Sequence, residues 1–333
     1  MKTLLMFCGL HKTGSTTLQK ALSLNSEVLA ENSIDYLTFT LKGLSGKIYK
    51  DTNHSRLMLM LFSARSPAEV RRKERDKLAA YLQKSSGQTL LITAEEISRF
   101  DNNELADCKR FFVEQGYDIH TALFVRKIRA WVDSIVAQRI AGYRGPNWTR
   151  DQVFAEFVRQ RGFVKPLLQN VTSVFPDIDL FSFDALLQQP GGLLAAFVNW
   201  AQLRELNLKL DAESTNERVA DAVVRFADFV HRETLVNGAA IKNQFLMEHD
   251  IFAKFKARKF HLRQSELQKY LPILRAENNW LGETYGDEFF DSQIDYFHEE
   301  LGCTEFQNFT EACASELSLS TQKLLAQYFK SAA

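Results

Sequence analysis

The 333-residue sequence has no excess of charge of either sign and no long apolar run. Lysine plus arginine and aspartate plus glutamate each number 41. This balance argues against a protein whose whole surface binds nucleic acid or a membrane, so an anion site would have to be local. The apolar run from Leu4 to Cys8 is far shorter than the roughly 18 residues that a membrane span needs. With no secretory signal recognisable, the sequence predicts a cytoplasmic protein with no membrane span and no nucleic-acid partner.

Cysteine and histidine are too few and too scattered to suggest a disulfide framework or a zinc site. The four cysteines share no CxxC spacing, which indicates free thiols in a reducing compartment: Cys8, Cys108, Cys303 and Cys313. The seven histidines show no ligand spacing with one another or with cysteine. We therefore expect no bound metal.

Six prolines in the whole chain leave no proline-rich linker, and no internal repeat or low-complexity tract is present. The sequence therefore predicts one domain over residues 1–333, with an α/β core in residues 1–200 that holds the candidate functional site described below. A mainly helical C-terminal extension is expected over residues 201–333.

Short apolar runs alternate with helical patterns in the first 190 residues. Near-continuous apolar character is typical of parallel strands that are covered on both faces. The expected strands are Thr3–Cys8, Ile34–Phe39, Thr89–Thr93, Thr121–Val125 and Ile178–Phe183. This alternation predicts an α/β fold, with a doubly wound sheet of about five parallel strands and helices on both faces.

Helix signals are clearest in the middle and in the last third of the chain. Ser66-Pro67-Ala68-Glu69 has serine as an N-cap, proline at the first helical position and glutamate three after the cap, and this helix should end near Gly87. Further helices are expected over Gly192–Leu206, Asn216–Thr234 and Gln264–Asn278.

A loop between the first strand and a helix from about Ser15 carries the strongest functional signal. A nucleotide-hydrolysing phosphate loop reads GxxxxGK[ST], and here Gly9 and Gly14 keep that spacing while Ser15 replaces the lysine. Main-chain N–H groups at a helix N-terminus attract an anion. Lys12, inside the loop, can lie beside the bridging oxygen of a phosphate-linked group and neutralise a departing phosphate without a metal.

The segment His11-Lys12-Thr13-Gly14-Ser15-Thr16-Thr17-Leu18-Gln19 resembles the 5′-phosphosulfate loop of sulfotransferases, most closely that of bacterial members that act on carbohydrates or small hydroxyl acceptors. The resemblance implies a P-loop-like fold and 3′-phosphoadenylyl sulfate (PAPS) as the sulfuryl donor. It also implies that Lys12 contacts the bridging oxygen. The donor loop would then consist of His11, Lys12, Thr13, Gly14, Ser15, Thr16 and Thr17.

A PAPS-binding protein should have a second anion site, because the donor carries a 3′-phosphate that ATP lacks. Arg126 ends a buried strand, and Ser134 follows eight residues later on the next helix. An arginine fork can hold a phosphate and a serine can donate one more bond. This spacing is similar to the 3′-phosphate motif of the family. Gln138, one turn later, either faces the acceptor or is a polar surface residue.

Transfer to a hydroxyl also needs a group that removes the proton. Glu95 and Glu96 follow the strand Thr89–Thr93, at the strand end where this fold places its chemistry. Since adjacent residues face different ways, we expect only one of them to point into the cleft. The segment resembles a Ser-x-Glu-Glu-Leu element of the bacterial members with Glu95 at the matched position. Glu96 and His11 remain alternatives for the base.

The loop around Tyr143 and Arg144 offers an aromatic face and a cation for a saccharide or other small acceptor, or it serves as a packed connector. One departure from the family is the absence of an RKGxxGDWK segment, which closes over the nucleotide in the cytosolic members.

Three other functions remain open at this stage. A small-molecule or nucleoside kinase of the same fold would need a lysine at position 15 or a metal-holding aspartate. A glycosyltransferase would need its DxD motif after a strand, whereas Asp177-Ile178-Asp179 enters one. A non-catalytic nucleotide-binding protein would keep the loop without the chemistry.

Overall fold

The computed structural model describes residues 1–37, 39–42, 48–51, 54–141, 148–159, 162–210, 219–237, 248–255, 258–297 and 304–332. They divide into two compact units. The first comprises Met1–Lys127, Val164–Asn216 and Trp280–Phe290, and the second comprises Ile128–Phe163, Glu217–Asn279 and Asp291–Ala333. The single domain over residues 1–333 stays a prediction.

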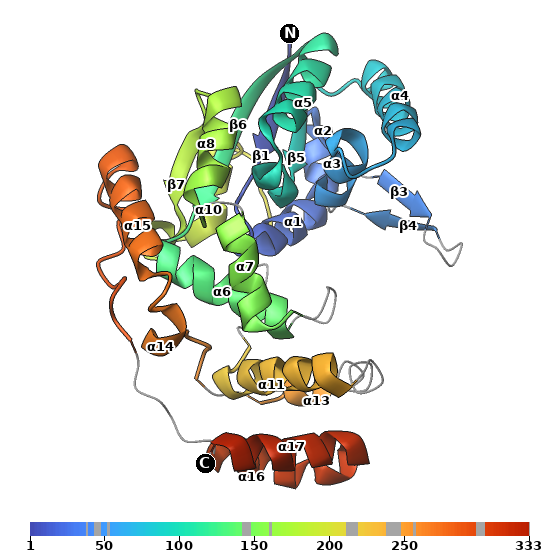
Figure 1. The fold of residues 1–333 in the computed structure, drawn as a ribbon. Helices are drawn as coiled ribbons and strands as arrows, with labels where there is room; N and C mark the ends of the chain where they lie inside the picture. The colour runs from blue at the N-terminus through green and yellow to red at the C-terminus, as the bar shows by residue number, and fades with distance from the viewer. Residues whose placement is uncertain are drawn as a thin grey trace. The chain divides into compact units, whose positions relative to one another are not determined.

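The first unit is built on a five-stranded, all-parallel sheet with helices on both faces, as the sequence predicts (Figure 1). In spatial order the strands are β2 (Ile34–Tyr36), β5 (Thr89–Thr93), β1 (Lys2–Phe7), β6 (Tyr117–Val125) and β7 (Asp179–Ser182). A separate antiparallel pair, which the sequence analysis missed, consists of β3 (Phe39–Lys42) and β4 (Ile48–Asp51).

Alternate residues of the central strands face the two helical layers. On one face Phe7 and Phe124 lie in a core with Leu18, Leu22 and Phe197. The helices of this core are α1 (Ser15–Leu24), α2 (Ser26–Glu31), α9 (Phe183–Leu186) and α10 (Gly192–Trp200).

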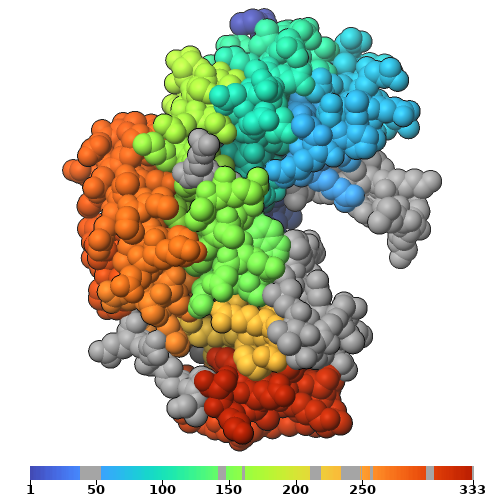
Figure 2. Space-filling model, viewed as in Figure 1, coloured from blue at the N-terminus to red at the C-terminus, as the bar shows by residue number. Residues whose placement is uncertain are grey.

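The other face of the sheet packs against helices through a group of aromatic rings. Phe112 contacts the rings of Phe62, Phe111 and Tyr117. The elements on this side include α3 (His54–Phe62), α5 (Asn102–Glu114), α8 (Lys165–Val174) and the 3₁₀ turn η1 (Glu95–Arg99). Helix α4 (Ala68–Lys84), packed on α3, buries only Leu78 and Leu82 and is broadly exposed (Figure 2).

The second unit is helical in its described residues. Its rings pack around Phe226, which contacts Phe252, Phe306 and Tyr328. Its helices are α6 (Ile128–Ala141), α7 (Arg150–Arg159), α11 (Asp221–Asn237), α13 (His249–Phe252), α14 (Gln264–Leu267), α16 (Thr304–Ala312), η2 (Ala314–Glu316) and α17 (Leu319–Ala332). Helix α15 (Leu271–Tyr285) has residues in both units.

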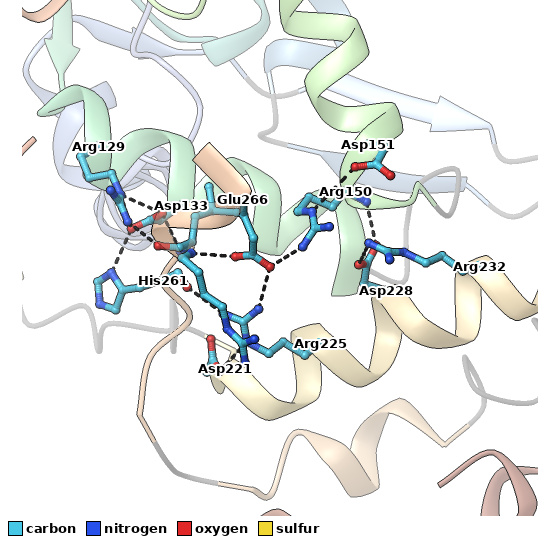
Figure 3. Close-up of polar contacts among 12 residues, drawn as sticks. Arg129, Asp133, Arg150, Asp151, Asp221, Arg225, Asp228, Arg232, His261 and Glu266 are labelled. Atoms are coloured by element: carbon cyan, nitrogen blue, oxygen red, sulfur yellow. Dashed lines mark hydrogen bonds and ion pairs between the residues drawn. The ribbon is translucent and has the colours of Figure 1, made fainter. Parts of the chain in front are cut away.

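A polar network ties three helices of the second unit together (Figure 3). Glu266, on α14, pairs with Arg150 of α7 and lies 2.8 Å from Arg225 of α11. Asp133, on α6, accepts hydrogen bonds from Arg129 at 3.3 Å and from the Leu262 N–H at 3.1 Å. These contacts hold buried carboxylates between cations and main-chain donors.

Three helix predictions need correction. Ser66 does not cap α4, because its hydroxyl donates to the carbonyl of Leu59 and the helix begins at Ala68. The helix from Gly192 stops at Trp200 rather than Leu206, since Gln202 adopts a left-handed φ of 56°. The expected helix Gln264–Asn278 is divided into α14 and α15, and Pro272 lies in the first turn of the second helix.

Within the described residues, no helix is long and apolar enough to cross a membrane. Cys8, Cys108 and Cys313 are free thiols, and Cys303 lies outside the described residues.

Candidate anion and base site

The loop between β1 and α1 lies at the carboxyl end of the parallel sheet, where ligands bind in such folds. Gly14 precedes α1 with a left-handed φ of 79°, and a Cβ there would lie 2.5 Å from Leu193 Cδ2. Glycine suits this position, because an L-residue is disfavoured at this φ and its Cβ would displace the Leu193 side chain.

Lys12 also adopts a left-handed conformation, with φ at 70°. For a residue with a Cβ this backbone geometry is uncommon and costs about 1 kcal/mol or more, and such strain is concentrated at functional sites. Burial lowers the pKa of the Lys12 ammonium, the nearby Arg126 lowers it further, and Glu95 opposes both. Lys12 thus lies in a strained turn, and its ammonium feels the charges of one cation and one carboxylate.

Main-chain donors collect at the start of α1. Among the residues that the structure describes, no acceptor takes a hydrogen bond from the N–H groups of Thr13 to Thr17. Of the side chains, the Thr13 hydroxyl donates to the carbonyl of Leu10 and the Ser15 hydroxyl donates to Glu95. The loop therefore presents N–H groups to an anion, while the hydroxyls of Thr13 and Ser15 fix the loop itself; Thr16 is exposed and Thr17 half-buried.

His11 joins the loop to both carboxylates of η1. Its Nδ1 lies 3.3 Å from Glu95 Oε1, and its Nε2 lies 3.2 Å from Glu96 Oε1. Both carboxylates thus contact one imidazole, because they come from the first residues of a tight 3₁₀ turn. That only one of them points into the cleft stays a prediction.

The three groups shift one another's pKa values. Burial alone would lower the pKa of His11, but hydrogen bonds to Glu95 and Glu96 outweigh it and raise the pKa to about 9. For Glu95, burial acts to raise the pKa, and hydrogen bonds from His11 and Ser15 bring it below its ordinary value. The pKa of Glu96 is lowered likewise, because His11, Arg99 and Arg65 outweigh burial. At neutral pH the cluster is thus an imidazolium between two carboxylates.

Arg126 follows β6 directly and is only 4% exposed. It donates to the carbonyl of Lys12 at 3.4 Å, and its guanidinium lies over the ring of Phe183. Its Nε is 3.9 Å from Asp184 Oδ1, and the other oxygen of Asp184 accepts from the Lys127 N–H at 2.6 Å. A buried arginine thus braces the loop that carries Lys12.

The remaining predicted site residues lie elsewhere in the chain. Ser134 is half-buried and Gln138 exposed, one turn apart on α6 of the second unit. Tyr143 and Arg144 lie outside the described residues. In the part of the chain that the structure describes, no group of three His, Cys, Asp or Glu side chains is arranged to hold a metal ion.

Sequence reasoning missed several residues at this edge of the sheet. Asp184 could have been found by the rule that selects Glu95, since it lies two residues past the end of β7. His54 and Ser55 hold the main chain around Glu95 from α3, about 40 residues away in sequence. No local sequence pattern predicts such a contact.

No protein family model matches the chain, and no curated protein matches it in sequence. The chain is similar in structure to a sulfotransferase domain from the curacin biosynthetic pathway, with a TM-score of 0.34 and 12% identity. The match covers 61% of this chain and 74% of that domain. At this level the likeness carries no conclusion on function, so a proposal has to rest on the residues of the chain itself.

Proposed function

We propose that the chain is a sulfotransferase that moves a sulfuryl group from PAPS to the hydroxyl of a saccharide or other small alcohol. The observation that carries the proposal is the loop of β1–α1, in which a strained Lys12 lies beside N–H groups that have no acceptor in the described chain. An ammonium inside the loop suits a departing phosphate, whereas a nucleotide-hydrolysing loop would carry its lysine at position 15.

In the proposed reaction, the acceptor oxygen forms a new S–O bond as the bond from sulfur to the bridging phosphate oxygen breaks. The acceptor proton passes to a carboxylate, and adenosine 3′,5′-bisphosphate leaves. Lys12 and the main-chain N–H groups of Thr13 to Thr17 stabilise the charge that develops on the 5′-phosphate. Arg126 binds the 3′-phosphate, and the same role for Ser134 is proposed from the sequence alone.

Glu95 is the proposed base. Its lowered pKa keeps it ionised at neutral pH, and Ser15 and His11 orient its carboxylate. His11 suits this task less well, since a group with a pKa of about 9 already carries its proton at pH 7. Glu96 pairs with Arg99 at 3.6 Å as well as with His11, and it provides a matched control.

The test is transfer from PAPS labelled in its sulfur to a panel of oligosaccharides and small alcohols, beside a parallel panel with ATP labelled in its γ-phosphate. We expect label to reach an acceptor from PAPS and no label to be transferred from ATP. Glu95→Gln should lower kcat about 10²- to 10⁴-fold, the usual contribution of a general base, with donor affinity nearly unchanged.

Glu96→Gln, its neighbour, should lower kcat less than about tenfold, because a residue that only pairs with His11 and Arg99 takes no proton. Transfer from ATP would favour the kinase alternative. An unaltered rate for Glu95→Gln would move the base to another residue.

A further inference from the structure

The first two residues of α3 hold the main chain on both sides of Glu95. His54 Nδ1 accepts a hydrogen bond from the Thr93 N–H at 2.8 Å, and Ser55 Oγ accepts one from the Glu96 N–H at 3.2 Å. Between them, the Ala94 N–H donates to the carbonyl of Phe7 at 2.9 Å. The turn that carries Glu95 is therefore tied to α3 at two points and to β1 at a third.

His54 lies where two neighbouring strands end. Its Nε2 is 2.5 Å from the carbonyl of Leu37, the residue after β2, while its Nδ1 faces Thr93 at the end of β5. The last paired residues of these strands are Tyr36 and Leu91. One imidazole thus links β2 and β5 by hydrogen bonds just past their last paired residues, at the carboxyl edge of the sheet where ligands bind in such folds.

The partners of His54 fix its protonation state. A carbonyl only accepts and a main-chain N–H only donates, so the ring is neutral with its proton on Nε2. His54 is fully buried, the Tyr36 ring meets it edge-on with centroids 5.0 Å apart, and the Tyr36 hydroxyl lies 3.3 Å from Thr93 Oγ1. The ring therefore has one tautomer and one tightly packed position.

We propose that His54, together with Ser55, is a positioning residue that sets where the Glu95 carboxylate lies against Ser15 and His11. This proposal rests on the proposed function, in which Glu95 takes the acceptor proton. Both ends of Glu95 are then held: its main chain by α3 and its carboxylate by the loop. A displacement of about 1 Å at a reacting group can lower a rate about 10²-fold. Loss of the α3 contacts should therefore displace the Glu95 carboxylate and lower kcat.

The test compares His54→Asn with His54→Gln in the full-length chain. The asparagine oxygen can take the place of Nδ1 and accept from Thr93, whereas the glutamine amide can take the place of Nε2 and donate only to Leu37. We expect His54→Gln to lower kcat about 100-fold with the donor KM unchanged, and His54→Asn to stay within about fivefold of the parent. His231→Gln, at a buried histidine of the second unit, should leave kcat unchanged and controls for folding.

A second measurement does not depend on activity. NMR titration of His11 reports whether Glu95 and Glu96 still lie against its imidazole, and His54→Gln should lower that titration midpoint markedly while His54→Asn should not. Equal kcat values for the two variants, or equal midpoints, would overturn the positioning role. If both His54 variants fail to fold, Ser55→Ala takes their place, with a loss of about tenfold in kcat expected and an unchanged kcat and midpoint overturning the proposal.

The two proposals fail in different ways. If the parent chain transfers no sulfuryl group to any acceptor, the proposed function fails, and the His11 midpoint still decides whether α3 positions Glu95. If the parent is active and His54→Gln retains its kcat, the positioning role fails and the proposed function stands.

Discussion

Two histidines at the same edge of the sheet are held in opposite protonation states. His11 lies between the carboxylates of Glu95 and Glu96, which favour its charged form. His54 lies between a carbonyl and an N–H group, which require its neutral form. A histidine is thus a charged or a neutral group according to its partners rather than its intrinsic pKa.

The charge of His11 leads to a prediction at the residue scale. Its pKa in the folded chain is about 9 because Glu95 and Glu96 outweigh the effect of burial, whereas in the unfolded chain it is about 6.5. The stabilisation from this raised pKa is therefore fully present below about pH 6.5 and lost as the pH rises through about 9.

His11→Asn should lower the free energy of unfolding by up to about 3 kcal/mol at pH 6 and by much less at pH 10. NMR titration of the parent and chemical unfolding of both proteins at the two pH values provide the measurement. A His11 midpoint near 6.5 would contradict the arrangement.

At the scale of elements, the sequence predicts the buried strands well and their edges less well. The strand Thr89–Thr93 is confirmed residue for residue, because all its side chains but the first are buried. β6 begins at Tyr117, four residues before the expected Thr121, since Asp118 and His120 at its start are exposed and break the apolar run. The pair β3–β4 was missed, although Phe39-Thr40-Leu41-Lys42 alternates apolar and polar residues as a half-exposed strand does.

The candidate site shows the same division between local and long-range information. The loop, Arg126 and the two glutamates are marked by their places after strands, so the chain order alone brings them to one edge of the sheet. The bond from Ser15 to Glu95 joins residues 80 apart, and the bond from Thr93 to His54 joins residues 39 apart. Such contacts depend on how strands and helices pack, which no local pattern encodes.

The polar network of the second unit gives a prediction at the scale of elements. Glu266, whose side chain is 8% exposed, joins α14 to α7 and α11 through Arg150 and Arg225. Glu266→Gln should lower the free energy of unfolding by about 1.5–3 kcal/mol at pH 7, because it removes the carboxylate that both partly buried arginines share and leaves each with only a more exposed one. Glu316→Gln should change it by less than about 1 kcal/mol, since both Glu316 and its partner Lys254 are exposed.

At acid pH the two substitutions should differ less in their effect on the free energy of unfolding. Burial acts to raise the pKa of Glu266, but Arg225, the Arg263 N–H and Arg150 bring it below its ordinary value. The stabilisation is therefore present above about pH 4.5, the unfolded value, and lost as the pH falls through the folded pKa. Urea unfolding at several pH values tests this, and an equal effect of both substitutions at pH 7 would contradict the role of the network.

At the scale of the whole molecule, a chain with no net charge would have to attract the proposed polyanionic donor through local groups. The first unit gathers Lys12 and Arg126 at one loop, with N–H groups of α1 beside them. The proposed function requires two anion sites from this arrangement, one for the 5′-phosphate at the loop and one for the 3′-phosphate at Arg126. Two separate sites would favour an adenosine with phosphates at both its 3′ and 5′ positions over a nucleotide with phosphates at one position only. This selectivity would need no metal ion.

Calorimetry with adenosine 3′,5′-bisphosphate and AMP, in a buffer with a metal chelator, tests this central claim most directly. We expect the bisphosphate to bind at least tenfold more tightly than AMP, because a charge-assisted bond to Arg126 contributes about 1.5–3 kcal/mol. Arg126→Ala should remove most of that difference, while Arg110→Ala, at an exposed arginine of α5, should leave it intact, with thermal unfolding confirming that both variants fold. Equal affinities of the parent chain for the two nucleotides would contradict the account.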